Sequence, residues 1–133
     1  GNRQDTSEPK SFWKFLSSSS QSIDMFINDQ EDMEEINQIL KVLISVSTKE
    51  RAGISIVAHK AMMDSFINML LGTTAKSMKL IVFIILANLA NIQQNMQNMA
   101  EHPQLLQTVI DVGFYNDCCK IREQSVKVIQ SMA

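Results

Sequence analysis

The sequence predicts an all-α fold made of about three helical repeats, and three observations lead to this prediction. Residues 80–86 are all apolar, which is typical of a helix that is buried on nearly every side. Glycine and proline are scarce, with 4 and 2 residues among 133, so turns are few. Apolar positions also recur along the chain, as Leu43 and Leu86 illustrate, with a period of 43 residues (86 − 43).

The period extends beyond the leucines. His59 is followed 43 residues later by His102, and Phe66 by Val109. A period of about 40–47 residues built from two or three helices is typical of armadillo and HEAT solenoids, in which at least three repeats must stack to bury a core. We therefore divide residues 10–133 into repeats at about 7–48, 49–91 and 92–133, preceded by a disordered leader over residues 1–9.

Local signals define the expected elements. A serine run at residues 17–20 can supply an N-cap, and Asp32 with Glu35 has the spacing of a capping box. Proline is favoured at the first helical position, so Pro103 predicts a helix start. The expected segments are, in order, a short amphipathic turn at 10–16 and helices at 17–28, 33–47, 49–59, 60–71, 74–91, 92–101, 103–113 and 120–132.

Composition excludes several classes of protein. The formal charge is −2 and no cluster of Lys and Arg is present, which argues against a dedicated nucleic-acid surface. The run at 80–86 is too short to cross a bilayer, and we expect no membrane segment. Cys118 and Cys119 are adjacent and predict reduced thiols in an intracellular protein.

Candidate catalytic groups have simpler explanations. The carboxylates between Asp29 and Glu35 fit the start of a helix, where the macrodipole favours negative charge. His59 and His102 have no neighbours at metal-ligand spacing, and we interpret both as residues of helix junctions. The two cysteines lack a histidine partner, and the glycines are too scattered for a phosphate-binding loop. We therefore expect no enzyme, no cofactor and no metal.

One motif resembles a known family. Residues 85–90, Ile-Leu-Ala-Asn-Leu-Ala, resemble the signature of the third helix of armadillo repeats. The resemblance implies a right-handed superhelix with each third helix on its concave face, where the asparagine, here Asn88, clamps the backbone of an extended peptide. The equivalent positions in the other repeats are Ser45 and Ser131, so the asparagine ladder of nuclear-import proteins is absent.

A more dispersed similarity involves residues 14–17, 64–72 and 101–103. These segments resemble the armadillo half of the heat shock factor 2-binding protein family of meiotic localisers. That resemblance implies a nuclear dimer that captures a segment of a recombination protein like the breast-cancer type 2 susceptibility protein. Without it, the expected location is cytoplasmic.

The expected binding surface follows from the period and the resemblance together. The corresponding residues are polar or basic in the outer repeats and include two isoleucines and two amides in the middle one. They are Gln38, Lys41, Ser45, Ile81, Ile84, Asn88, Asn91, Gln124, Lys127 and Ser131. We expect a non-enzymatic adaptor that binds a peptide segment of a partner protein. The alternative is a structural module that forms homo-oligomers through its end repeats.

Overall fold

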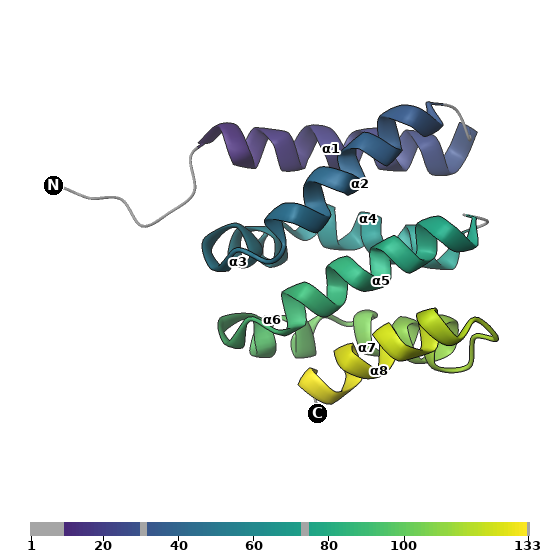
Figure 1. Cartoon of the computed structure of the whole chain (residues 1–133). Coiled ribbons are helices and arrows are strands. Elements are labelled where there is room, and N and C mark those ends of the chain that lie inside the picture. Colours follow the sequence, from purple (N-terminus) through teal and green to yellow (C-terminus); the bar gives the residue numbers. More distant parts are fainter. Residues whose placement is uncertain (1–9, 30–31, 73–74, 133) are drawn as a thin grey trace, which may run out of the picture.

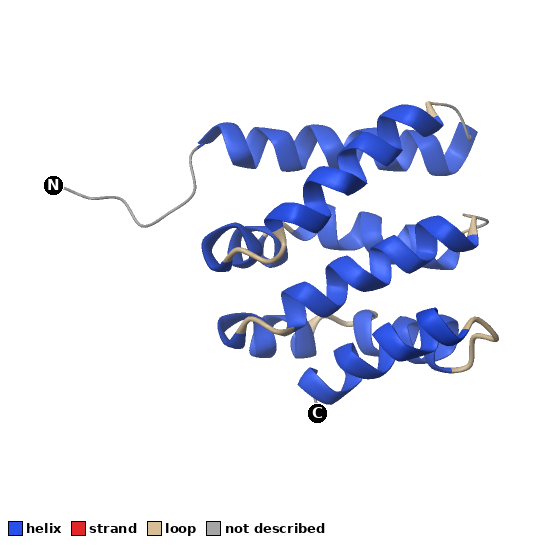
Figure 2. Ribbon diagram, in the orientation of Figure 1, coloured by secondary structure: helices blue, strands red, loops and turns tan. Residues whose placement is uncertain are grey.

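The computed structural model describes residues 10–29, 32–72 and 75–132, and within these ranges the chain is helical with no strand (Figure 2). The predicted all-α class is therefore confirmed, whereas the predicted leader at residues 1–9 lies outside the described residues. The elements are α1 (Lys10–Asp29), α2 (Met33–Val46), α3 (Glu50–Ala58), α4 (Lys60–Leu71), α5 (Lys76–Ala90), η1 (Gln93–Asn95), α6 (Met96–Glu101), α7 (Leu105–Thr108), η2 (Val109–Phe114) and α8 (Cys119–Met132).

The helices form three stacked tiers (Figure 1). The first tier contains α1 and α2, the second α3 to α5, and the third α6 to α8. Helices α2, α5 and α8 lie side by side and form one face, which we call the front face, and α1, α4 and α7 lie behind them. Helix α5 contacts both α2 and α8, which explains why its sequence is apolar on nearly every side.

The core runs through all three tiers. Phe66 of α4 and Phe83 of α5 are fully buried and are the largest side chains at its centre. Packing is tight beside them, because a Cβ added to Gly113 would lie 2.5 Å from the Ser125 Cβ and 2.7 Å from the Phe83 Cζ. Glycine at this position thus allows η2 to approach α5 and α8.

Hydrogen bonds between tiers follow the sequence period. The Asn88 amide donates to the Ser47 hydroxyl at 3.0 Å, across 41 residues. The hydroxyls of Ser20 and Ser65 bond at 2.8 Å, across 45 residues, and buried Asn95 donates to the Gly53 carbonyl at 3.2 Å, across 42. Residues close to one period apart therefore lie next to each other in successive tiers.

The first tier departs from the expected elements, because α1 is one continuous helix where a turn and a separate helix were predicted. The second tier breaks at His59, between α3 and α4, which meet at 81°. The His59 Nδ1 accepts a hydrogen bond of 3.1 Å from the Met62 N–H and so caps α4. The equivalent residue of the first tier is Leu16 (59 − 43), which cannot cap a helix and is buried.

Two predicted helix starts are wrong in detail. Asp32 has a left-handed backbone (φ 56°) and makes no side-chain cap bond, so no capping box forms at α2. Capping requires an extended backbone at that position. Helix α7 begins at Leu105, two residues after Pro103, because the His102 Nδ1 accepts from the Gln104 N–H at 3.3 Å and holds a turn there.

No single described helix has both the length and the apolarity to span a membrane. Two bent pairs, α3 with α4 and α5 with the segment Gln93–Glu101, meet the length and composition criteria only when each pair is taken together.

Candidate functional site

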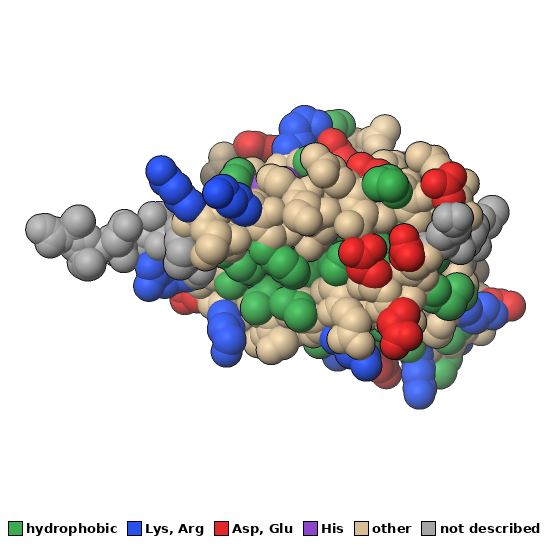
Figure 3. All heavy atoms as spheres, turned by 90° about the horizontal axis from the view of Figure 1, so that it is seen from above, with side chains coloured by type: hydrophobic (Ala, Val, Ile, Leu, Met, Phe, Trp, Pro, Cys, Tyr) green, Lys and Arg blue, Asp and Glu red, His purple; other side chains and the backbone are tan. Residues whose placement is uncertain are grey.

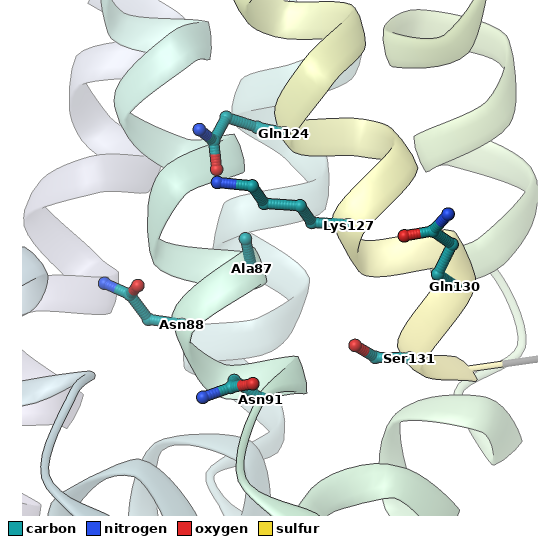
Figure 4. A pocket seen from close by; sticks show the side chains of 7 residues that line it. All are labelled: Ala87, Asn88, Asn91, Gln124, Lys127, Gln130 and Ser131. Carbon is teal, nitrogen blue, oxygen red and sulfur yellow. The ribbon is translucent and has the colours of Figure 1, made fainter.

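A hollow on the front face lies between α5 and α8 (Figure 4). It has a volume of about 430 Å³ and is open to solvent. Helix α5 contributes Ala87, Asn88 and Asn91, and helix α8 contributes Gln124, Lys127, Gln130 and Ser131. We call this hollow the α5–α8 groove.

Five of the predicted binding residues lie in this groove, namely Asn88, Asn91, Gln124, Lys127 and Ser131. They converge because 43 residues separate equivalent positions of α5 and α8, which lie side by side. The Gln124 and Lys127 side chains extend from α8 toward α5 in Figure 4. The period of 43 residues therefore predicted that these residues of α5 and α8, which are distant in sequence, lie close together.

The other five predicted residues lie outside the groove. Gln38 and Lys41 line a separate hollow of about 390 Å³ on α2, beside Met33, and Ser45 is exposed. Ile81 and Ile84 on α5 are half-buried, and Ile81 packs against the core. Seven of the ten residues thus line two separate hollows and three line neither, so the ten do not make one uniform strip.

Sequence reasoning missed Ala87 and Gln130. These two residues are themselves 43 apart, and both line the groove. The period of 43 residues relates these two positions to each other. The predicted residues, however, follow one another along each helix at spacings of three or four, and this spacing omits Ala87, the neighbour of Asn88. The small side chain of Ala87 leaves room between the longer amides, so it shapes the hollow without contacting a ligand through a polar group.

The groove is rich in hydrogen-bonding groups and poor in charge. Asn88, Asn91, Gln124 and Gln130 carry carboxamides, each of which can both donate and accept. Lys127 is the single charged side chain among the seven that line it. The groove can therefore bond the N–H and C=O groups of a peptide backbone and attract one carboxylate.

Asn88 is held in place by the neighbouring tier. Its Nδ2 donates to the hydroxyl of Ser47, which is fully buried and also donates to the Ile44 carbonyl at 2.9 Å. In Figure 4 the Asn88 nitrogen points away from α8. One of its functions is thus structural, and a ligand in the groove would meet the remaining polar edge of a fixed amide.

The groove holds few groups that can transfer protons. No histidine, cysteine or carboxylate is among its seven lining residues, and Lys127 is the one side chain of a kind that serves as a general acid or base. Among all described residues, no group of three or more His, Cys, Asp or Glu side chains is placed to hold a metal ion.

Both histidines instead serve the tier junctions. His59 is buried, its Nε2 lies 3.0 Å from the Ser17 hydroxyl, and its ring contacts Trp13 with centroids 4.6 Å apart. Burial lowers the pKa of His59. The His102 Nε2 lies 3.1 Å from an Asp64 oxygen. Burial raises the pKa of Asp64, but its hydrogen bonds to Lys60 and His102 outweigh this effect and lower it overall.

Comparison with known proteins adds no relative. The chain matches no family model, no curated protein and no solved structure. The resemblance to armadillo repeats therefore rests on the motif at residues 85–90, on the period of 43 residues and on the tiered helices.

Proposed function

We propose that this chain is an armadillo-type adaptor of about three repeats that binds an extended segment of a partner protein in the α5–α8 groove. The observation that carries the proposal is the convergence of four carboxamides and Lys127 on one open hollow between two helices. Carboxamides suit a peptide backbone because each can bond both of its polar groups. Specificity then comes from the side chains of the ligand.

The surroundings of the groove suggest the composition of that ligand. Lys127 favours an acidic residue, and the half-buried Ile84, one turn before Asn88 on α5, offers an apolar contact. Apolar anchors supply most of the affinity at such surfaces, while exposed charges mainly affect association rate and salt dependence. We therefore propose a segment with one hydrophobic anchor and nearby acidic residues.

The experiment is a selection from a library of random peptides on the intact chain, followed by calorimetry with the selected peptides. Gln130→Trp places a large ring in the groove from an exposed position and should weaken binding at least about tenfold. Gln21→Trp puts the same ring on exposed α1, behind the front face, and should leave affinity unchanged. Peptides that bind both variants as tightly as the original chain would place the binding site elsewhere and refute the proposal.

A further inference from the structure

The three helices of the front face bury different rows of side chains. Helix α5 buries an upper row, which faces the first tier, and a lower row, which faces the third. The upper row is Met78, Val82, Ile85 and Leu89, and the lower row is Phe83, Leu86 and Ala90. Helix α2 buries the counterparts of the lower row, Leu40, Leu43 and Ser47, while α8 buries the counterparts of the upper row, Ile121, Ser125 and Val128.

The upper row of α2 is only partly covered. It consists of Glu35, Ile39, Val42 and Val46, which are the counterparts of the four buried residues of the upper row of α5. Glu35 and Val42 are exposed, whereas Ile39 and Val46 are half-buried and pack against the core. Val42 is 45% exposed, whereas its counterpart Ile85 is fully buried. Figure 3 looks onto this end of the stack and shows a patch of hydrophobic side chains with acidic groups to one side. We call this surface the upper end face.

The lower row of α8 is only partly covered in the same way. It consists of Arg122, which is exposed, and of Val126 and Ile129, which are half-buried. The counterparts of Val126 and Ile129 in α5 are Phe83 and Leu86, which are fully buried. Behind them, Leu106 is 41% exposed where its counterpart Met63 is 1% exposed. We call this surface the lower end face.

The two end faces match in register. Within the stack, a lower-row residue faces an upper-row residue about 42 positions later, as Phe83 and Ser125 illustrate, since both lie against Gly113. The same rule applied between two copies of the chain brings Arg122 to Glu35. It brings Val126 to Ile39 and Ile129 to Val42, so apolar residues meet apolar residues and opposite charges meet.

We propose that the upper end face of one copy binds the lower end face of another, so that copies stack head to tail and continue the tiers. Such an interface is heterologous, and one copy can therefore bind a neighbour at each end. The occupant is a second copy because the charges are complementary at the same level of the register. This inference does not depend on the groove.

Stacking would also extend the front face. The helix α8 of one copy, with Gln124 and Lys127, would lie beside α2 of the next, with Gln38 and Lys41. These pairs occupy equivalent positions, 86 residues apart. The hollow on α2 would then adjoin a neighbouring helix as the groove on α5 does.

The test is sedimentation velocity on the intact chain over a wide concentration range, with charge-reversed variants. Glu35→Arg and Arg122→Glu each place like charges at the junction, which is strongly unfavourable, and each should weaken self-association by about tenfold or more. The double variant should regain it. An equimolar mixture of the two single variants should form stacks in which the variants alternate, because the lower end face of each variant is opposite in charge to the upper end face of the other.

Two exposed residues away from both end faces give controls with the same change of charge. Glu101→Arg and Lys49→Glu should sediment like the original chain. A chain that remains monomeric at every concentration would overturn the proposal. Self-association that neither charge reversal weakens would overturn it as well, since another surface would then pair the copies.

Discussion

His59 explains a difference between the first two tiers, because it caps α4 where the equivalent residue of α1, Leu16, cannot. It is buried, its Nδ1 accepts the cap bond of α4, and its Nε2 must then hold the proton that bonds Ser17. Protonation of Nδ1 would remove the cap, which agrees with the lowered pKa that burial causes. The backbone N–H of His59 thus bonds the last turn of α3, while its imidazole caps α4 and contacts the tier above.

The pH dependence of stability follows from this arrangement. Because the pKa of His59 is lower in the folded than in the unfolded chain, the unfolded chain binds more protons as the pH falls. His59 therefore contributes stability above its ordinary pKa of about 6.5, and this contribution is lost as the pH falls through the lowered value. Urea unfolding at pH 7.5 and pH 5 should show the loss.

The variant His59→Asn separates this contribution from those of other groups. Asparagine caps helices well and does not titrate in this range, so the variant should lose less stability between the two pH values than the original chain. Equal losses in both proteins would mean that His59 is not the group responsible. His59→Ala should cost about 1 kcal/mol at pH 7.5 through loss of the cap.

Asn88 provides a second test at the residue scale. Since its amide bonds the buried Ser47 hydroxyl, Asn88→Ala should lower the free energy of unfolding by about 1 kcal/mol. Ser47→Ala should cost a similar amount, and the double variant should cost less than the sum, because both single changes break the same bond. Additive effects in urea unfolding would contradict this account of the contact.

At the scale of elements, equivalent positions of α2 and α5 should respond differently to the same change. Ile85→Lys buries an unpaired charge between two tiers and should cost about 3 kcal/mol or more. Val42→Lys changes the equivalent residue on the uncovered row and should cost less than about 1 kcal/mol. Thermal unfolding at low protein concentration, where copies are separate, measures both, and similar losses would refute the assignment of the rows.

Helix positions were largely predictable, and their boundaries were not. The apolar run 80–86 identified α5 because burial on two sides leaves no polar stripe. Serines at 17–20 are typical of a helix N-cap and led to the prediction of a helix start there. The structure instead has one continuous helix α1. In the structure Ser19 and Ser20 are buried within the helix, and Ser20 bonds the Ala61 carbonyl and Ser65 in the next tier.

At the scale of the whole molecule, the period of 43 residues predicted which segments would meet. Asn88 and Lys127, for example, are distant in sequence and both line the α5–α8 groove. The period could not predict that Ile81 packs against the core or that α2 forms a hollow of its own. Those features depend on the angles between helices and on which rows of side chains lack a neighbouring tier. The period of apolar residues predicts neither the angles nor the uncovered rows.

The proposed function depends on one surface, and nuclear magnetic resonance can locate it directly. A peptide obtained by the selection described above would be titrated into the isotope-labelled chain while the backbone amide shifts are followed. We expect the largest changes at Asn88, Asn91, Gln124, Lys127 and Gln130, with little change in α1 and α4. Changes centred on α1 and α4, with the groove residues unmoved, would contradict the assignment of the binding site to the α5–α8 groove.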